Sequence, residues 1–511
     1  MMGELKQIAA GQEDRPSAVA SHGPEADSNG NPLTLHRAAW LLPVASPPLS
    51  NGAVLVRDHH ILAAGPYPEV KTVSPPGTRE VDHGSSAIIP GLVNAHTHLE
   101  LSALSGRIEL PQPGFASWLT ALLALRPLMT REFLAQGVAR GHRELLAAGC
   151  CLCGDITNGA GLKPVPQSRQ PELPTDARND LLGSRTPTIH PPETRNPNLS
   201  DQHAIPSNRN PSAPISLISP HASPLTPHSS PTCQAFLEVL GFDRHHLADA
   251  VEDEVVALVE GSPAWKVPPS LAAHACYSTA GTVIREAKEW CRPRGRPFSI
   301  HVAEHPEELQ LLSNGTGFCR DLLAALDRWD PQWQAPGKTP VRYLEDLQVL
   351  DVETLLVHAV HLTDDDWEVV ARNHCPVCFC PRSNHNLTVG RPDIGTALHS
   401  GVPVALGTDS LASNTDLNLF AEMAFVLDHY PAVPAAAVVA MATLGGAGAL
   451  GQERSFGSID PGKQADLLVV SVPASLAHHQ LYETIIHQGT KGAWQWLPHP
   501  ATGCAWAKSA I

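Results

Sequence analysis

The chain has 511 residues, with 35 Lys and Arg against 51 Asp and Glu and a formal net charge of −16. This length suits a barrel-sized domain plus a smaller one. The negative charge is spread without long blocks of one sign, which argues against binding to nucleic acid or anionic lipid. We therefore expect a small-molecule substrate, with neither nucleic acid nor a membrane as a partner.

The first 36 residues lack the apolar core that a secretion signal needs. Residues 431–451 carry no charge, but Ala, Gly and Pro supply most of them, which favours a buried helix over a membrane span. We expect a cytoplasmic protein whose 11 cysteines are reduced. Six of these cysteines lie in two strand-like apolar runs: Cys150, Cys151, Cys153, Cys375, Cys378 and Cys380. In such runs we favour small core residues over a thiolate zinc site.

The two chain ends are predicted to form one β-sandwich domain. Residues 1–31 are polar and predict a disordered tail. Residues 32–89 alternate short apolar runs with turns and form the first part of this domain. Residues 453–511 form the second part, where a strand-like run from Asp466 to Val472 follows the turn Asp460-Pro461-Gly462.

Residues 90–452 alternate short apolar strands with helix-like stretches, which indicates an α/β fold and a (β/α)8 TIM-type barrel. Residues 160–232 break this pattern, because Pro, Ser, Asn and Thr dominate them, and they predict a disordered insertion. The predicted barrel strands are Leu92–Ala95, Cys151–Ile156, Phe236–Leu240, Leu271–Ala273, Phe298–Ile300, Thr354–Val357, Val377–Cys380 and Val402–Leu406.

His96-Thr97-His98 ends the first barrel strand, and residues i and i+2 of a strand point the same way, so both imidazoles can face one ion. The bare pair discriminates little, because 27 histidines give roughly one or two such pairs by chance. Any single histidine of this kind is more often a hydrogen-bonded core residue. Barrel enzymes carry their chemistry at strand ends, however, and further strands end in His274, His301, His358 and Asp409.

Five segments carry a resemblance to a known family, in this order: PGLVNAHTHLELS, SIHVAEHPEE, LLVHAVHL, CPRSN and VALGTDSLASN. The tail GSIDPGKQADLLVV adds a match in the predicted β domain. With these motifs the chain resembles the amidohydrolase superfamily, in particular its branch of cyclic-amidine deaminases and triazine chlorohydrolases. That branch includes S-adenosylhomocysteine and aminofutalosine deaminases. The resemblance covers nearly the whole chain outside the tail and the insertion.

The resemblance implies that His96, His98, His301 and Asp409 ligate one divalent metal ion, with zinc the first choice and iron the second. Three imidazoles and a carboxylate, with water in the remaining position, are also what chemistry asks of a catalytic zinc site. Such an ion lowers the pKa of bound water from 15.7 toward about 7.

Three residues are predicted to be catalytic. The resemblance implies that Glu304 moves a proton from water to the substrate, although a solvated glutamate at a helix start is the alternative. Asp409 accepts the second proton. His358 stabilises the charge that develops during attack, and His361 competes for this role.

Substrate contacts are predicted for His274, Trp118 and Glu100. The histidine matches a family segment in which Cys276 here replaces a usual proline, and that departure puts the shape of the loop in doubt. Trp118 resembles an aromatic residue that covers the pocket in relatives, although a buried core tryptophan is the alternative. Weaker candidates at the pocket edge are Ser383, Asn384 and His385.

The leading hypothesis is therefore a metal-dependent hydrolase acting on carbon–nitrogen bonds other than peptide bonds, which deaminates a purine-like or other cyclic amidine with release of ammonia. HTHLELS resembles the aminofutalosine deaminase group, and adenosine-type nucleosides are comparable candidates. A chlorohydrolase or amide hydrolase would use the same residues. A barrel that binds a ligand without turnover is the alternative from another class. A homo-oligomer is left open.

Overall fold

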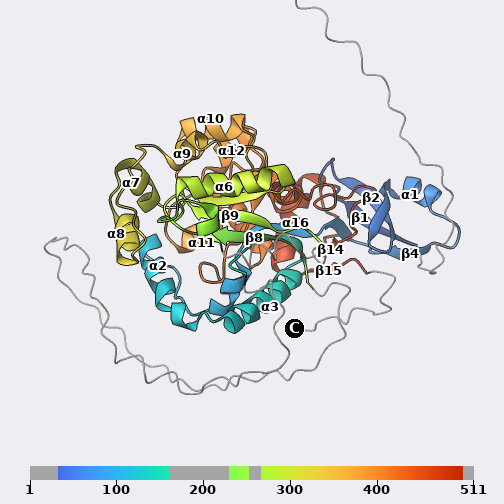
Figure 1. The fold of residues 1–511 in the computed structure, drawn as a ribbon. Helices are drawn as coiled ribbons and strands as arrows, with labels where there is room; N and C mark the ends of the chain where they lie inside the picture. Colours follow the sequence, from blue (N-terminus) through green and yellow to red (C-terminus); the bar gives the residue numbers. More distant parts are fainter. Residues whose placement is uncertain (1–32, 160–229, 252–265, 499–511) are drawn as a thin grey trace, which may run out of the picture. The chain divides into compact units, whose positions relative to one another are not determined.

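A computed structural model of the chain describes residues 33–159, 230–251 and 266–498 (Figure 1). The predicted tail 1–31 and most of the predicted insertion 160–232 lie outside these ranges, so both stay predictions. Within the described ranges, no helix is long and apolar enough to cross a membrane.

Eight parallel strands form a sheet in which each strand pairs with its neighbour in the chain. The ring closes between its first and last strands, because Thr97 and Asp409 form a parallel bridge and Thr408 N donates to His96 O at 3.1 Å. The predicted α/β barrel is confirmed. Its strands are β6 (Leu92–Thr97), β7 (Cys150–Thr157), β8 (Thr232–Val239), β9 (Ser270–Ala275), β10 (Phe298–Val302), β11 (Thr354–His358), β12 (Val377–Phe379) and β13 (Val404–Leu406).

The barrel strands form where the sequence has short apolar runs, and most of their residues are buried. β6, β7, β10 and β11 are buried at every position, as expected for parallel strands covered on both faces. The last strand begins at Val404, two residues later than predicted from Val402. Pro403 explains the difference, because proline has no N–H to donate to a neighbouring strand.

Helices follow the barrel strands and pack against them; α3 contacts β7, α6 contacts β9 and α13 contacts β13. The uncharged stretch 431–451 forms a largely buried helical segment, α14 to α15, as expected. The helices of the barrel are η1 (Leu99–Leu104), α2 (Phe115–Ala124), η2 (Arg126–Leu128), α3 (Arg131–Ala147), α4 (Leu247–Ala250), α6 (Gly281–Cys291), η3 (Arg292–Arg294), α7 (Pro306–Asn314), α8 (Phe318–Ala325), α9 (Pro340–Asp346), α10 (Asp364–Arg372), α11 (Pro381–Asn386), α12 (Ile394–His399), α13 (Leu419–His429), α14 (Ala435–Ala440), η4 (Met441–Gly445) and α15 (Gly446–Ala449).

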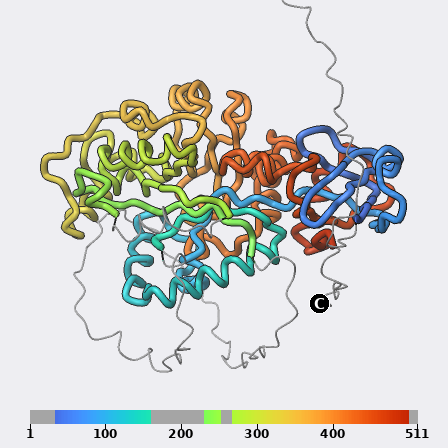
Figure 2. The backbone as a smooth tube through the Cα atoms, turned by 45° about the vertical axis from the view of Figure 1, so that its right-hand side comes forward, coloured from blue at the N-terminus to red at the C-terminus, as the bar shows by residue number. Residues whose placement is uncertain are grey.

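The two chain ends share a second sheet of seven strands, as the sequence predicts. β14 pairs antiparallel with β5, from Leu467 opposite Pro90 to Ser471 opposite Ser86, and Figure 2 shows the blue N-terminal strands beside the red C-terminal segment. β5 leads through Gly91 into β6, the strand that carries His96. The elements are β1 (Thr34–Leu41), β2 (Leu49–Arg57), β3 (His60–Pro66), α1 (Tyr67–Val73), β4 (Arg79–Asp82), β5 (Ser86–Pro90), β14 (Leu467–Ser471), η5 (His478–Gln480), α16 (Leu481–Thr490) and β15 (Trp494–Trp496).

The six cysteines of the two apolar runs are buried free thiols. Burial raises the pKa of the Cys150 thiol to about 12, so it stays protonated. Among the described residues, the side-chain groups that could hold a metal ion contain histidine and glutamate but no cysteine. The structure therefore supports a place in the core for these cysteines rather than a thiolate zinc site.

Candidate active site

Four side chains from three strands converge at the carboxyl ends of the barrel strands. His96 and His98 stand at the end of β6, His301 lies in β10, and Asp409 follows β13. The Nε2 atoms of His96 and His301 are 3.3 Å apart. Oδ1 of Asp409 lies 3.6 Å from Nε2 of His98 and 3.8 Å from Nε2 of His96. The structure thus brings together all four residues that the sequence predicts as metal ligands.

The close approach of β13 to β6 depends on a glycine. A Cβ at Gly407 would lie 2.8 Å from the backbone oxygen of His96, so a side chain there would push the two strands apart. Asp409 follows with a positive φ of 57°, and Oγ1 of Thr97 donates to its backbone oxygen at 2.9 Å. This bend stands at the point where the carboxylate faces the histidines.

The protonation states of these groups suit a metal ion. Burial, reinforced by neighbouring imidazoles, lowers the pKa values of His96 and His301 well below their usual range, so both rings are neutral. Nδ1 of His301 donates to the backbone oxygen of His274 at 2.7 Å, which leaves the lone pair on Nε2 facing His96. Burial alone would raise the pKa of Asp409, but the nearby imidazoles, His98 first, lower it to about 2, so its carboxylate is charged.

A divalent cation fits this donor set. Three neutral imidazoles and one carboxylate are the ligands that zinc and iron take in catalytic sites, with a position left for water. Two nitrogen atoms facing each other at 3.3 Å need a cation or a proton between them. The described residues offer a second group of this kind, Glu238, His274 and His301, which shares His301 with the first.

Two serines hold the other oxygen of the Asp409 carboxylate. Ser383 Oγ and Ser413 Oγ each donate to Oδ2 at 2.7 Å, which leaves Oδ1 to face the histidines. Removing partners that orient a ligand typically weakens metal binding by about 10–100-fold. We therefore expect the Ser383→Ala, Ser413→Ala double variant to bind zinc about 10–100-fold more weakly, measured by competition with a chromophoric chelator.

The control for this prediction is Ser471→Ala, because Ser471 is exposed on β14, outside the site. Its zinc affinity should equal that of the unchanged protein. An unchanged affinity in the double variant, with circular dichroism showing both proteins folded, would mean that the two serines do not orient the ligand.

Glu304 stands just after β10, where Ala303 has a positive φ of 48°. Its side chain is buried, and Oε1 lies 3.6 Å from Nε2 of His358. Burial first, then the neighbouring carboxyl groups of Asp409 and Glu308, raises its pKa well above the usual range. A carboxyl group with a raised pKa holds a proton more readily and can both take and give one during a reaction. The alternative of a solvated glutamate at a helix start does not agree with this burial.

His358 ends β11 and is buried beside Glu304. Burial lowers its pKa to about 4, so the ring is neutral. Asn384 Nδ2 donates to its Nδ1 at 3.1 Å, which places the ring proton on Nε2, the nitrogen that faces Glu304. Nε2 of the competing candidate, His361, instead donates to the backbone oxygen of Val389 at 2.7 Å. The geometry therefore supports His358.

Glu308 lies behind Glu304 in the same motif and is fully buried. Its Oε2 accepts a hydrogen bond from the backbone nitrogen of Glu304 at 3.2 Å. Burial raises its pKa to about 8, although the backbone nitrogens of Glu304 and Ala303 oppose the shift. The carboxyl group is thus mostly protonated at neutral pH and supports the bend that presents Glu304.

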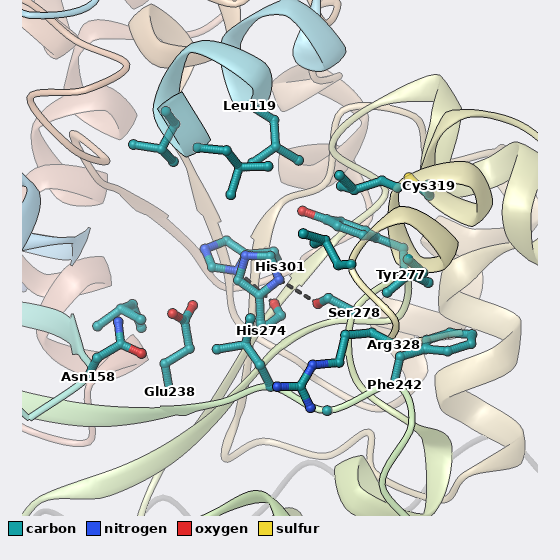
Figure 3. Close-up of a pocket in the computed structure, with 18 of the residues that line it drawn as sticks. Leu119, Asn158, Glu238, Phe242, His274, Tyr277, Ser278, His301, Cys319 and Arg328 are labelled. Atoms are coloured by element: carbon teal, nitrogen blue, oxygen red, sulfur yellow. Dashed lines mark hydrogen bonds between the residues drawn. The ribbon is translucent and has the colours of Figure 1, made fainter. Parts of the chain in front are cut away.

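A cavity of about 580 Å³ opens onto the metal-ligand set, and His98, His301 and Asp409 line it. Trp118 of α2 also lines this cavity, and its Nε1 donates to the backbone oxygen of Ala412 at 2.9 Å. His274 of β9 also lines the cavity, with Nδ1 2.5 Å from Ser278 Oγ (Figure 3). Both predicted substrate-binding side chains therefore reach the cavity.

Both carboxylate oxygens of Glu100 accept hydrogen bonds from other residues of the protein. It lines the cavity, but its Oε1 accepts from Thr157 Oγ1 at 2.6 Å and its Oε2 from Asn158 N at 3.1 Å. These bonds favour a role in fixing the end of β7 over contact with substrate. His385 is exposed on α11 and is not among the residues that line the cavity, so its effect on the site edge stays a prediction. Cys276 is buried in the hydrophobic core and is not among the residues that line the cavity.

Glu238 and Ser413 belong to the site, although no motif of the sequence predicts them as site residues. Glu238 is the one charged residue of β8, in the otherwise apolar run Ala235 to Leu240, and it lines the cavity. A lone charge near the end of a buried strand is the signal that could have identified it. Ser413 stands in the VALGTDSLASN segment, but sequence alone does not show that its hydroxyl reaches Asp409.

Comparisons with known proteins agree with this geometry. The sequence profile of the amidohydrolase family matches residues 238–493. An aminodeoxyfutalosine deaminase from Deinococcus radiodurans is 30% identical over 416 residues, covering 80% of this chain and 83% of that protein. A 5-methylthioadenosine/S-adenosylhomocysteine deaminase from Nitratidesulfovibrio vulgaris is 27% identical over 462 residues, covering 86% and 85%. The structure of an adenosine deaminase from Xanthomonas campestris with bound zinc matches with a TM-score of 0.62 and 22% identity, covering 89% of this chain and 90% of that one.

A parallel barrel with three histidines and an aspartate at the carboxyl ends of its strands defines a metal-dependent hydrolase. This chain belongs to the amidohydrolase family. It is a hydrolase that acts on carbon–nitrogen bonds other than peptide bonds, and its cofactor is a metal ion. The predicted family, fold and class of enzyme are confirmed.

Proposed function

We propose that this chain uses one zinc ion to deaminate a purine nucleoside of the adenosine or aminofutalosine type, with release of ammonia. The observation that carries the proposal is that Glu304 and His358, 3.6 Å apart, line the same cavity as His98, His301 and Asp409. The relatives from Deinococcus radiodurans and Nitratidesulfovibrio vulgaris, both named as deaminases of this kind of compound, support the choice of substrate class.

Each residue of the site has a distinct part in such a reaction. A bound zinc ion supplies Lewis-acid chemistry that lowers the pKa of water from 15.7 toward about 7. Glu304 takes one proton of the attacking water and delivers it to the ring nitrogen beside the amine-bearing carbon. His358 donates from Nε2 to the oxygen that gains negative charge. Asp409 accepts the second proton, which leaves with the amine as ammonia while the carbon–oxygen double bond forms.

The cavity suits a nucleoside in size and in character. Its volume of about 580 Å³ falls within the range of about 300–1,000 Å³ that is common for small-molecule sites. Trp118 lines the same cavity as the metal-ligand set, and a flat heteroaromatic base can stack on an indole ring. The leucines Leu119, Leu122 and Leu323 line the cavity as well.

The test is an assay of ammonia release by the purified, metal-analysed protein. The substrates are adenosine, 5-methylthioadenosine, S-adenosylhomocysteine, aminofutalosine, guanine and cytosine. We expect turnover of at least one of the four nucleosides and none of guanine or cytosine. Release from guanine or cytosine alone would contradict the nucleoside class. The absence of release from all six, with metal bound, would contradict the deaminase and favour another leaving group.

A further inference from the structure

A carboxylate that the mechanism does not use faces the cavity. Glu238 near the end of β8 is partly buried, and its Oε1 is shielded from solvent without any hydrogen-bond partner in the part of the chain that the structure describes. Figure 3 shows its side chain pointing into the cavity, with Asn158 beside it and His274 opposite. A buried carboxylate oxygen without a partner is costly, so a ligand is the natural source of its hydrogen bonds.

The other acidic side chains of the cavity differ from Glu238. Both oxygens of Glu100 accept hydrogen bonds from the end of β7. Asp243 pairs with Arg328, with distances of 3.1 and 3.4 Å to the guanidinium. Asp249 is exposed at the cavity mouth. Glu304 and Asp409 belong to the reacting centre. Among these six acidic residues, only Glu238 has a solvent-shielded oxygen without a hydrogen-bond partner in the described part of the chain.

A second metal ion is a poor candidate for the missing partner. The side chains of Glu238, His274 and His301 have ligand atoms within 4.8 Å of one another. Nδ1 of His301, however, donates to the backbone oxygen of His274, and Nε2 faces His96 at 3.3 Å. No ring nitrogen of His301 remains for a second ion, and the two ligands that are left are fewer than a stable site needs.

The partner must therefore donate hydrogen bonds, and the proposed substrate class limits what it can be. An N9-substituted adenine carries only acceptors at its ring nitrogens, so its hydrogen-bond donors are the exocyclic amine, which reacts, and the hydroxyls of the sugar. An ionised carboxylate has two oxygens that can accept from two neighbouring hydroxyls at once. The sugar is thus the part of a nucleoside that meets the requirement of Glu238.

We infer that Glu238 is the sugar-recognising residue of this enzyme, whose carboxylate accepts hydrogen bonds from the 2′- and 3′-hydroxyls of a ribose. This inference rests on the proposed function, since it assigns part of the same cavity. It makes the ribose a requirement for productive binding, because a substrate without the hydroxyls leaves the buried carboxylate unpaired.

The experiment compares adenosine and 5-methylthioadenosine with their 2′,3′-dideoxy forms as substrates of the zinc-loaded protein. We expect the unchanged protein to prefer the hydroxylated form by about 100-fold in kcat/KM. Glu238→Gln should reduce this ratio to a few-fold, chiefly by losing activity on the hydroxylated form. Asp249→Asn removes the same charge at the cavity mouth and should leave the ratio unchanged.

Two outcomes would overturn the assignment. One is a ratio near one in the unchanged protein. The other is a Glu238→Gln variant that loses activity equally on both forms, which would make Glu238 a positioning residue. Calorimetric binding of adenosine and 2′,3′-dideoxyadenosine to the unchanged and Glu238→Gln proteins separates this inference from the proposed function. A hydroxyl-dependent affinity that the variant loses supports sugar recognition even if no ammonia is released, whereas equal or absent binding rejects it.

Discussion

Replacing Glu304 by glutamine is expected to lower kcat for ammonia release by about 10²–10⁴-fold, the range found when a general acid or base is removed. Glutamine keeps the size and one acceptor oxygen but cannot take or give the proton. Glu304 is not a metal ligand, so the variant should bind metal in the same ratio as the unchanged protein. The measurement is steady-state ammonia release alongside metal analysis of the same preparation.

The matched control for this prediction is Glu308→Gln, four residues further on in the same motif. Burial raises the pKa of Glu308 to about 8, so the residue is already mostly neutral at pH 7. A glutamine oxygen can still accept from the backbone nitrogen of Glu304. We expect this variant to retain most of the activity. Equal losses of activity in the two variants would show that the two glutamates act by maintaining the backbone bend, and that Glu304 is not the proton carrier.

The barrel could be predicted from the sequence because parallel strands covered on both faces are short, continuous apolar runs. The prediction of where the site lies follows from the same pattern. Once Leu92–Ala95, Phe298–Ile300 and Val402–Leu406 are strands, the polar residues just beyond them must meet at one end of the barrel. The structure places His96, His301 and Asp409 together there.

Side-chain partners from distant segments could not be predicted in this way. The hydroxyl of Ser413 reaches Asp409 because the loop after β13 folds back on itself. The hydroxyl of Ser383, on α11, donates to the same carboxylate. Glu100 stands only two residues after His98 in sequence, yet η1 turns it toward Thr157, which is 57 residues away. Spacing along a strand fixes which residues share a face, but not what they bond to on another element.

The carboxylate of Glu238 is a second case in which the sequence does not identify the partner of a side chain. Its strand was predicted, but a charged residue in an apolar run is compatible with a salt bridge, a buried network or a ligand site. What favours the ligand is that no described residue is a hydrogen-bond partner of Oε1, which lies at the wall of the cavity.

Removing the metal ion is expected to abolish turnover and to destabilise the protein, because the ligands come from strands at opposite ends of the barrel sequence. Dialysis against a strong chelator should reduce ammonia release to the background rate, and adding zinc should restore it. A ligand present at about 1,000 times its dissociation constant stabilises the folded state by about 4.1 kcal/mol, so the apoprotein should unfold at a lower temperature in calorimetry.

The His301→Ala variant should reproduce this loss without chelator, whereas His385→Ala, which changes an exposed histidine outside the cavity, should keep both metal and activity. The comparison also separates the two classes of hypothesis for this barrel. A protein that binds a ligand without turnover would still gain thermal stability from zinc through His301, but it would release no ammonia with any substrate of the panel. We therefore compare turnover with metal content in the unchanged, chelated and His301→Ala proteins. Only a metal-dependent hydrolase gives a turnover that rises and falls with the metal content.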